Sequence, residues 1–565
     1  MGRTIARLWL DSVAAAHPGP AYLYEVDGEW VEVSRAEAAR AVEELANGLL
    51  AIGVRKGDAF GLLARTTLEW ALFDFALALT GAVGAPIYAS SSSRDAQYVL
   101  EHSQAVGVLV EDEAQRAKVT GVEHVLSFAD LPTLRERGRE FAAEHPDALA
   151  RRTESIGEDD LFTFIYTSGT TGPPKACMIR HRNYYAMAAK GDDMEERLSL
   201  PGDVMLLYLP LAHNYGRLLH LSAAYVGYTL AFLPDPLRAA EELPRVRPTL
   251  FPSVPRVYEK MHAAVRARFD EERGARGMVA RWALDVGRRR SVLLQARKPV
   301  PPLLRAQHRL ANRLVYSQIG ARLGGRLRIA NSGGAPLSRD VAEFFHALDI
   351  LILEGYGLSE ITTAATVNLP RDFKFGSVGK ALPGVEIRIA PDGEILIRSD
   401  TVFAGYYHDE EATRETLDAD GFVHTGDVGH LDDDGFLVIT DRKKDIIVTA
   451  GGKNVAPQNL ENELKLHPLV SQVLVVGDRR PYVAALVTVD ADAVNGLAPD
   501  DVLAAVQAAV DDVNRERSPF EQIRRFAVLP RDFTIEHDEV TPTLKLRRKV
   551  ILEHFADDVE ALYRP

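Results

Sequence analysis

A segment rich in glycine and hydroxyl residues stands near residue 170. Leu161 to Tyr166 are apolar or β-branched and predict a short strand, and they are followed by Thr167, Ser168, Gly169, Thr170, Thr171, Gly172, Pro173, Pro174 and Lys175. A strand that leads into such a loop can present backbone N–H groups and hydroxyls to phosphate. The glycines allow close backbone approach and Lys175 adds a positive charge. We therefore expect a phosphate-binding loop.

The spacing differs from that of the nucleotide-hydrolase loop G-x-x-x-x-G-K-[ST]. In that loop the lysine directly follows the second glycine, and the next hydroxyl holds magnesium. Here two prolines separate Gly172 from Lys175, and Ala176 follows. Because proline lacks an N–H group and restricts the residue before it, the loop does not run straight into a helix. A Ser/Thr-rich linker is the alternative, which the preceding strand and Lys175 disfavour.

The loop resembles the signature of the adenylate-forming enzymes, which include acyl-CoA synthetases, luciferases and the adenylation domains of peptide synthetases. Their loop reads T-S-G-T-T-G-x-P-K-G, and this chain departs from it at Ala176. Five further segments resemble motifs of the family, in the same order. They are Asn331-Ser332-Gly333-Gly334-Ala335-Pro336, Glu354-Gly355-Tyr356-Gly357-Leu358-Ser359-Glu360, Thr425-Gly426-Asp427, Asp441-Arg442-Lys443-Lys444 and Thr541-Pro542-Thr543-Leu544-Lys545. The resemblance covers almost the whole chain.

The resemblance implies an enzyme that joins a carboxylic acid to AMP from ATP. A cation must then bridge two anions, and Lys545 stands at the position of the family's catalytic lysine, although Thr-Leu precedes it in place of Ser-Gly or Thr-Gly. Glu360 matches the carboxylate that binds Mg²⁺, a cation that prefers oxygen ligands, and the Thr170 hydroxyl is expected nearby. Without the motifs, Lys545 would be interpreted as a solvated lysine and Glu360 as a surface acid.

Adenosine recognition is also implied by the resemblance. Tyr356 is expected to stack on the adenine, with Gly357 beside it, while the Gly334–Ala335 backbone lines the edge of the base. Asp427 would accept hydrogen bonds from the ribose hydroxyls, and Arg442 would donate to them. Ser359 keeps the hydroxyl of a commoner threonine. From the pattern alone, Asp427 lies in a loop between two predicted strands and would be an ordinary turn aspartate.

A second half-reaction, in which a thiol takes the acyl group, is implied as well. In this family the C-terminal domain rotates between the two steps, and Lys444 stands at the hinge position. Gly452 would admit the pantetheine arm of CoA and Lys453 would close the site; a tight turn is the alternative for this Gly-Gly pair.

Three features favour long-chain acids, as in bacterial long-chain fatty-acid:CoA ligases. They are the segment 254–260 with the basic stretch after it, the Glu before Gly355, and the form of the 541–546 segment. His213 matches a position in the acyl pocket. The following residues, Asn214 to Arg217, depart from the pattern of long-chain enzymes, so medium-chain or unusual acids stay open.

The elements that must position these residues alternate between strand and helix. Ser34 to Leu50 is amphipathic and begins with a capping box at Ser34 and Glu37, Ala59 to Leu63 predicts a strand, and Leu68 to Leu79 a helix. The fold class is therefore α/β, with parallel-sheet subdomains. Short strands from about residue 376 predict a small, mostly antiparallel subdomain. We expect an N-terminal domain at 1–443 and a mobile α+β domain at 444–565.

Composition limits the partners. The 565 residues carry a net charge of −14, which argues against a surface built for nucleic acid.

The single cysteine, Cys177, is expected to be a small buried residue in a reducing cytoplasm. No secretory signal is evident, and the apolar run 70–88 predicts a helix leading into a strand, because Asp74, Gly81, Gly84 and Pro86 interrupt it.

One segment is strongly basic. Residues 256–328 hold 18 Lys and Arg against 5 Asp and Glu, a balance of +13 that leaves −27 for the rest of the chain. Solvated basic helices, contact with anionic lipid, and an acidic ligand such as a nucleotide phosphate are the interpretations.

The sequence thus predicts a cytoplasmic long-chain fatty-acid:CoA ligase that uses ATP, Mg²⁺ and CoA, with small-molecule substrates and peripheral contact at the inner membrane face through residues 256–328. Two alternatives stay open. One is a fatty-acyl-AMP ligase or acyl-carrier-protein synthetase of the same fold, and the other is a catalytically silent protein that binds acyl-adenylate and acts in regulation.

Overall fold

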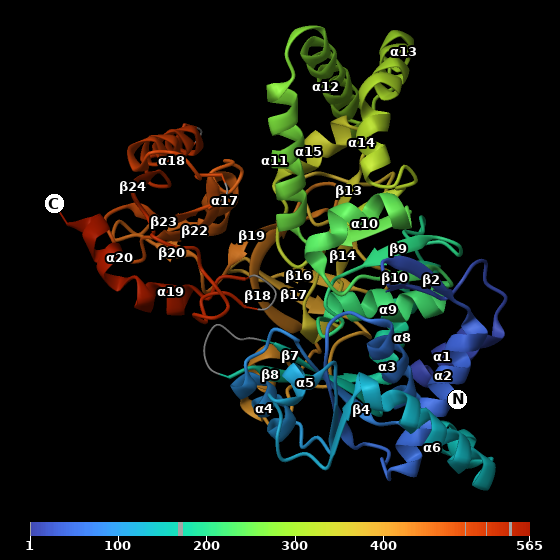
Figure 1. Cartoon of the computed structure of the whole chain (residues 1–565). Helices are drawn as coiled ribbons and strands as arrows, with labels where there is room; N and C mark the ends of the chain where they lie inside the picture. Colours follow the sequence, from blue (N-terminus) through green and yellow to red (C-terminus); the bar gives the residue numbers. More distant parts are fainter. Residues whose placement is uncertain (1, 168–172, 492, 516, 542–544, 565) are drawn as a thin grey trace.

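Two large sheets, covered by helices, form most of the first 380 residues (Figure 1). The computed structural model describes residues 2–167, 173–491, 493–515, 517–541 and 545–564. The first sheet has the order β6-β5-β3-β4-β7-β8 and is parallel except for the β7–β8 pair. Its strands are β3 (Ala59–Leu63), β4 (Val83–Ile87), β5 (Gly107–Val110), β6 (His124–Ser127), β7 (Leu161–Thr167) and β8 (Lys175–Arg180).

The second sheet has nine strands in the order β15-β14-β13-β12-β11-β9-β10-β1-β2. The strands from β13 to β1 in this order pair in parallel, and β2, β14 and β15 pair antiparallel at the edges. They are β1 (Tyr22–Val26), β2 (Glu29–Val33), β9 (Val204–Leu207), β10 (Thr229–Phe232), β11 (Leu250–Ser253), β12 (Ile329–Ser332), β13 (Ile352–Tyr356), β14 (Thr366–Val367) and β15 (Lys380–Ala381). The predicted α/β class with parallel-sheet subdomains is confirmed.

The helices of this part follow the sequence signals closely. Ser34 caps α2 with the expected capping box, and the apolar run 70–88 forms most of α3 and then β4. Among the described residues, no helix combines the length and the apolar character needed to cross a membrane. The helices are α1 (Ile5–Ala14), α2 (Arg35–Ala51), α3 (Leu68–Thr80), α4 (Ser93–His102), α5 (Glu113–Arg116), α6 (Leu131–Glu144), α7 (Ala148–Glu154), α8 (His181–Ala189), α9 (Asn214–Val226), α10 (Ala239–Val246) and α15 (Arg339–Ala347).

The basic segment forms a helical arm, residues 255–322, that projects from the rest of the molecule (Figure 1). Its helices are α11 (Pro255–Glu271), α12 (Gly274–Gln295), α13 (Pro302–Ala311), the π-helical turn η4 (Asn312–Tyr316) and α14 (Ser317–Arg322). Ala283, Val286 and Ala311 are fully buried within the arm and against α15, so its inner face is a packed core. The helical character expected from the sequence is confirmed.

A small antiparallel sheet follows, as the short strands predicted. It consists of β16 (Glu386–Ile389), β17 (Glu394–Arg398), β18 (Val423–Leu431) and β19 (Leu437–Arg442), and α16 (Glu410–Thr416) packs beside it. The expectation that Asp427 lies in a loop between strands is wrong, because Asp427 lies inside β18 and pairs in register with Arg442 of β19. The β18–β19 register shifts between Val428 and Gly429, close to Asp427, as at a β-bulge.

In the last 120 residues, the described part of the chain forms a three-stranded sheet, a two-stranded hairpin and four helices, which stand to one side in Figure 1. The elements are β20 (Ile447–Val448), β21 (Asn454–Val455), α17 (Pro457–Leu464), β22 (Val470–Val476), β23 (Val483–Val489), α18 (Pro499–Asn514), β24 (Ile523–Val528), α19 (Arg548–His554) and α20 (Ala556–Tyr563). Two apolar clusters on opposite faces of the three-stranded sheet are built from residues of this region alone. The N–H of Gln458 donates to the Asp441 carboxylate and joins the region to β19.

A fully buried ion pair joins the two large sheets. Arg217 of α9 and Asp74 of α3 are both 0% exposed, and the Arg217 guanidinium also donates to the Thr163 hydroxyl of β7. The guanidinium lies 4.5 Å from the ring centroid of Phe162 and 5.5 Å from that of Trp70. Burial raises the pKa of Asp74, and Arg217 opposes that effect. The pair explains why a charged residue interrupts the apolar run of α3.

We predict that Arg217→Met lowers the free energy of unfolding by about 3–5 kcal/mol, because it leaves the Asp74 carboxyl buried without its partner. Urea denaturation followed by tryptophan fluorescence measures this loss. The double variant Arg217→Met/Asp74→Leu should regain most of it. Arg289→Met, which breaks an exposed pair with Asp285, is the control and should cost less than about 1 kcal/mol. An equal loss in the two single variants would contradict the assignment.

Candidate active site

A cavity of about 1830 Å³ lies between the sheets, the small antiparallel sheet and the C-terminal region. Its wall includes the last residues of three strands, namely Thr167 of β7, Ser332 of β12 and Tyr356 of β13. Ligands of open α/β sheets bind outside the carboxyl ends of the strands. The cavity is therefore where the fold places a ligand.

The predicted phosphate loop connects β7 to β8 in an antiparallel pair, with Thr167 opposite Lys175. As expected from the prolines, no helix follows the loop. Ser168, Gly169, Thr170, Thr171 and Gly172 lie outside the described residues, so the structure places only the two ends of the loop, both in the cavity wall. The Lys175 ammonium is 3.6 Å from the Asp409 carboxylate and 5.3 Å from the Tyr406 ring centroid.

Glu360 lines the same part of the cavity and accepts a hydrogen bond of 2.6 Å from the Tyr406 hydroxyl. Tyr406 thus contacts both the predicted metal carboxylate and Lys175, and sequence reasoning missed it. No motif in the sequence marks Tyr406. An antiparallel bridge between Cys177 and Tyr406 brings it here, and such a tertiary contact cannot be inferred from local sequence. Cys177 is fully buried, as expected.

Three of the residues expected around adenosine form one connected group. The Tyr356 hydroxyl donates to the Asp427 carboxylate at 2.6 Å, and the Arg442 guanidinium is 3.3 Å from the other carboxylate oxygen. Asp427 is 6% exposed, and all three residues line the cavity. The β18–β19 register sets the spacing of Asp427 and Arg442, and the end of β13 supplies Tyr356. Hydrogen-bond acceptors, a guanidinium and an aromatic ring are therefore presented together.

The loops beside Tyr356 hold the remaining residues of this group. Gly334, Gly357 and Ser359 line the cavity, whereas Ala335 is exposed and is not part of the described wall. A Cβ atom on Gly357 would lie 1.7 Å from the Thr363 carbonyl oxygen, so only glycine allows this close approach.

Glu354 stabilises the same region through a buried hydrogen bond. Its carboxyl is buried, accepts a hydrogen bond of 2.9 Å from the N–H of Leu337, and has a pKa that burial raises to about 8. The protonated carboxyl fixes the end of the Gly333–Pro336 loop. The sequence marks this glutamate by its position directly before the Gly-Tyr-Gly segment, but it does not indicate that the carboxyl would hold the neighbouring loop.

Lys545 reaches the cavity from the C-terminal region. The structure thus brings the predicted catalytic lysine to the same cavity as the site residues of the N-terminal part of the chain. The side chain is accessible to the cavity yet enclosed by protein, and this enclosure lowers its pKa to about 8. The charge of Arg442 contributes to the lowering, whereas Asp427 and Glu360 oppose it. The ammonium therefore lies in the field of all three residues.

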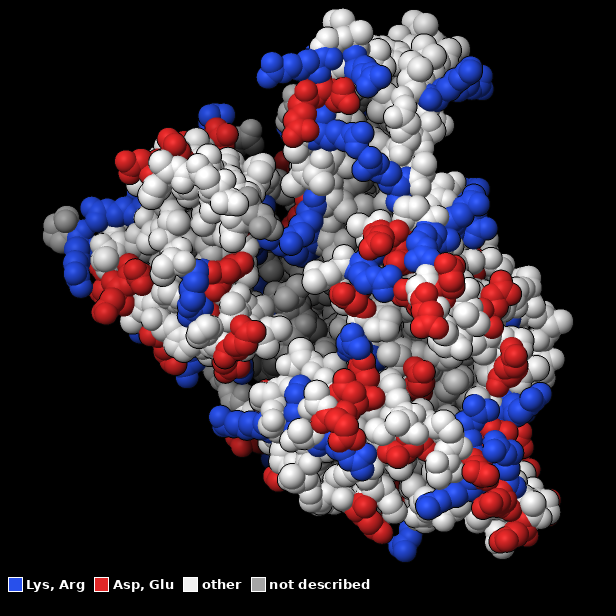
Figure 2. Space-filling model, in the orientation of Figure 1, with Lys and Arg blue, Asp and Glu red and all other residues white. Residues whose placement is uncertain are grey.

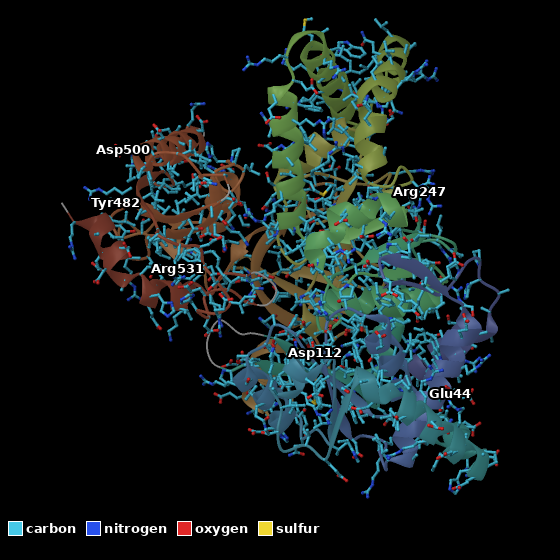
Figure 3. The ribbon with its side chains drawn as sticks, in the orientation of Figure 1. Glu44, Asp112, Arg247, Tyr482, Asp500 and Arg531 are labelled. Carbon is cyan, nitrogen blue, oxygen red and sulfur yellow. The ribbon has the colours of Figure 1, made fainter. Side chains whose placement is uncertain are left out.

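The backbone on both sides of residues 542–544, which lie outside the described residues, is anchored inside the C-terminal region. The backbone of Thr541 donates to the Lys545 carbonyl, Val540 bridges Leu546, and the N–H of Arg547 donates to the Glu539 carbonyl. Glu539 is fully buried and accepts two hydrogen bonds of 2.6 Å from Arg531, a residue labelled in Figure 3. Burial alone would raise the pKa of Glu539, but Arg531 and His554 lower it to about 2. Sequence reasoning missed Glu539 and Arg531 as supports of Lys545.

Of the three residues expected to act in the second half-reaction, Lys444 lines the cavity and the other two do not. Gly452 and Lys453 form the turn of the β20–β21 hairpin outside the described cavity wall, and the Lys453 ammonium lies 5.8 Å from the Phe520 ring centroid. In this arrangement of the chain, the tight-turn alternative describes the Gly-Gly pair.

The other end of the cavity is largely apolar and follows α9. Asn214, Tyr215, Leu218, Leu219, Ser222, Tyr225 and Val226 line it. This spacing is that of one face of a helix, and the 13 residues of α9 span about 20 Å. Met187, Met194, Leu198, Met205 and Leu250 supply further apolar lining. At the far end, the Tyr225 hydroxyl donates to Asp192, which also pairs with Arg197.

His213 lines the cavity next to the start of α9. Its place in an acyl pocket stays a prediction. His213 caps α9, with its Nδ1 accepting from the N–H of Tyr215 at 3.1 Å. Burial lowers its pKa to about 4, and the charge of Lys545 contributes. His213 is therefore neutral at pH 7.

The fold and this site define an adenylate-forming enzyme architecture, and comparison with known proteins agrees. The model of the AMP-binding enzyme family matches residues 10–407, and that of the AMP-binding enzyme C-terminal domain matches residues 444–565. The chain belongs to the AMP-binding enzyme family.

Individual relatives cover almost the whole chain. A long-chain-fatty-acid–CoA ligase, FadD15 from Mycobacterium bovis, is 40% identical over 95% of this chain and 93% of its own. The adenylation domain of a carboxylate reductase from Mycobacterium chelonae has a TM-score of 0.78 at 25% identity, covering 100% of this chain and 91% of its own. The anthranilate CoA ligase AuaEII in complex with anthranoyl-AMP has a TM-score of 0.76 at 20% identity, with 99% and 98% covered, and supports the fold.

We predict that Gly357→Ala weakens AMP binding about tenfold, because its Cβ would displace the Thr363 backbone and with it Tyr356 and Ser359; overpacking of this kind typically costs 1–3 kcal/mol. Isothermal titration calorimetry with AMP measures the change. Gly191→Ala is the control, since Gly191 also lines the cavity but has no atom within 4 Å of a Cβ. Unchanged AMP affinity in Gly357→Ala would show that the loop tolerates the methyl group.

Proposed function

We propose that this protein is an ATP-dependent long-chain fatty-acid:CoA ligase that forms an acyl-adenylate and then acyl-CoA, releasing pyrophosphate and AMP. One observation carries the proposal. A single cavity joins a polar end, with Lys545, Tyr356, Asp427 and Arg442, to an apolar end that follows α9 for its whole length. Such a cavity suits an amphiphile whose carboxylate meets a nucleotide and whose chain is long and apolar. The name of the FadD15 relative supports the same substrate class.

In the first step, the acid's carboxylate attacks the α-phosphate of ATP, a new acyl–phosphate bond forms, and the bond to pyrophosphate breaks. Two anions must approach each other, so a preorganised cation that contacts both lowers the barrier. We assign this role to Lys545. Tyr356 would stack on the adenine, and Asp427 and Arg442 would bind the ribose hydroxyls. The Thr167–Lys175 loop, with Ser168, Gly169, Thr170, Thr171 and Gly172, would hold the phosphates.

The site fits a magnesium ion that is shared with the substrate. Among the described residues, no group of three or more His, Cys, Asp or Glu side chains could hold a metal by itself. Mg²⁺ bound with substrate phosphates needs only one or two carboxylates. Glu360, with Thr170 expected nearby, would hold the ion, which would supply positive charge against the triphosphate.

In the second step, the thiol of CoA attacks the acyl carbonyl and AMP leaves. Lys545 occupies that side of the cavity, so we propose that residues 444–565 rotate as a domain about Lys444. Rotation would withdraw Lys545 and bring Gly452 and Lys453 toward the cavity. The separate apolar clusters of this region support its movement as a unit. We place the enzyme in the cytoplasm, at the face of the inner membrane.

The decisive experiment is AMP release across a panel of fatty acids of increasing chain length, with and without CoA. Long-chain acids should give the highest rates, and AMP release should depend on CoA, because the adenylate stays bound without a thiol. Activity confined to short or aromatic acids would contradict the long-chain assignment. Adenylate turnover that is indifferent to CoA would favour transfer to a carrier protein, and no AMP from any acid would favour a regulatory protein without turnover.

We predict that Lys545→Ala slows adenylation by roughly 10²–10³-fold or more, as for the loss of other preorganised donors. Pyrophosphate exchange with a saturating acid measures this step. Lys549→Ala is the matched control, because Lys549 lies four residues away, is 70% exposed and points to Glu553. Its rate should be unchanged.

The same lysine sets an expected pH dependence. Lys545 is protonated below its pKa of about 8 and loses its charge above it. Therefore kcat/KM for ATP, which reports the free enzyme, should fall as the pH rises through about 8. Lys545→Arg, whose side chain stays charged, should lack this decline. A decline that persists in the arginine variant would assign it to another group.

A further inference from the structure

The outer face of α13 and η4 combines exposed leucines with arginines. Leu303, Leu310 and Leu314 are 72%, 50% and 42% exposed, and their spacing of seven and four residues places them on one side of the helix. Arg305, Arg309 and Arg313 repeat every four residues beside them and are exposed. Leu304, Ala311 and Val315 occupy the opposite, buried side. We call the six exposed residues the arm face.

The arginines of the arm face have unneutralised charge. Among the described residues, Arg305, Arg309 and Arg313 make no ion pair, whereas Arg290 and Arg297 of the same arm pair with Asp349 and Asp372 of the main body. The arm therefore divides its basic residues between those that attach it to the body and those that face outward. Figure 2 shows Lys and Arg side chains spread over the arm, with uncharged atoms at its free end.

Leu303 and Leu310 of the arm face are among the more exposed large apolar side chains of the described chain, as are Met278 and Val292 of α12, which are 62% and 63% exposed; Leu237, outside the arm, is 90% exposed. Exposed apolar side chains that lie in one stripe mark a surface that is covered by a partner. A polyanion such as a nucleic acid would neutralise the arginines but leave the leucines in water. A bilayer with anionic headgroups accommodates both, because the leucines enter the acyl boundary and the guanidinium groups stay among the phosphates.

We propose that the arm face docks on an anionic lipid bilayer, with α13 lying in the plane of the interface. Charge complementarity supports this occupant, since residues 256–328 carry +13 within a chain whose remainder carries −27. The acidic remainder is repelled by the same surface, so the arm orients the molecule on the membrane. This inference extends the membrane location proposed above, but it does not depend on the proposed reaction, because it uses only the exposed residues of the arm.

Sedimentation of the full-length protein with vesicles tests the proposal. One set of vesicles contains phosphatidylcholine alone, and the other contains equal parts of phosphatidylcholine and phosphatidylglycerol. The protein should sediment with the anionic vesicles at low salt, much less with the neutral ones, and be released as salt rises. Failure to bind the anionic vesicles at low salt would overturn the proposal, and so would binding to soluble heparin without any binding to vesicles.

Two variants locate the surface. Arg305→Gln/Arg309→Gln/Arg313→Gln should weaken vesicle binding about 100-fold, equivalent to about 1 kcal/mol per arginine near an anionic surface. Leu303→Ser/Leu310→Ser should weaken it about tenfold or more, because the apolar contribution is lost. Both variants should keep the thermal transition of the wild type and its AMP formation from a water-soluble acid without vesicles.

The matched controls remove the same groups elsewhere. Arg371→Gln/Arg479→Gln/Arg515→Gln changes the net charge equally at side chains that are 91%, 93% and 74% exposed. Leu237→Ser/Leu503→Ser removes two leucines that are 90% and 50% exposed. These controls should bind anionic vesicles like the wild type. Equal losses in controls and arm variants would mean that binding depends on net charge or general hydrophobicity and would overturn the assignment to the arm face.

Discussion

The buried pair of Arg217 and Asp74 is the constraint on which the rest of the molecule depends. It holds α9 against α3 and β7, and thereby joins the two large sheets. The opposite face of α9 forms one wall of the apolar part of the cavity. A charged pair in this position tolerates little displacement, because any separation leaves unpaired charge in an apolar setting. The cavity wall is thus fixed by an interaction on the far side of the helix.

The fold was predictable from the sequence to a large extent, because local signals and tertiary structure agree. The capping box at Ser34, the interrupted apolar run of α3 and the proline-rich end of the phosphate loop each correspond to an observed boundary. Asp427 was misplaced, since an isolated Thr-Gly-Asp looks like a turn. Asp427 is part of a strand because it pairs with Arg442, which lies 15 residues later in the chain. Local patterns carry no information about such pairing.

The candidate site was predictable only where motifs marked it. Tyr356, Glu360, Asp427, Arg442 and Lys545 were found in this way, and the structure brings them to one cavity. Tyr406, Glu354 and the Glu539–Arg531 pair were missed as members or supports of the site, because their roles arise from contacts across 46, 17 and 8 residues. Positioning residues of this kind need no special spacing or composition. Three-dimensional structure is required to find them.

The anchoring of Lys545 within the C-terminal region has a consequence for the protons that the enzyme binds. In the proposed rotation, Lys545 would move out of the cavity, and its pKa would return from about 8 toward the ordinary value of 10.5. Between these two values the opened arrangement binds one more proton than the closed one. Domain opening would then be coupled to proton uptake and favoured by lowering the pH within that interval, and below it the coupling vanishes. A single lysine would make the enzyme's large-scale motion sensitive to alkaline pH.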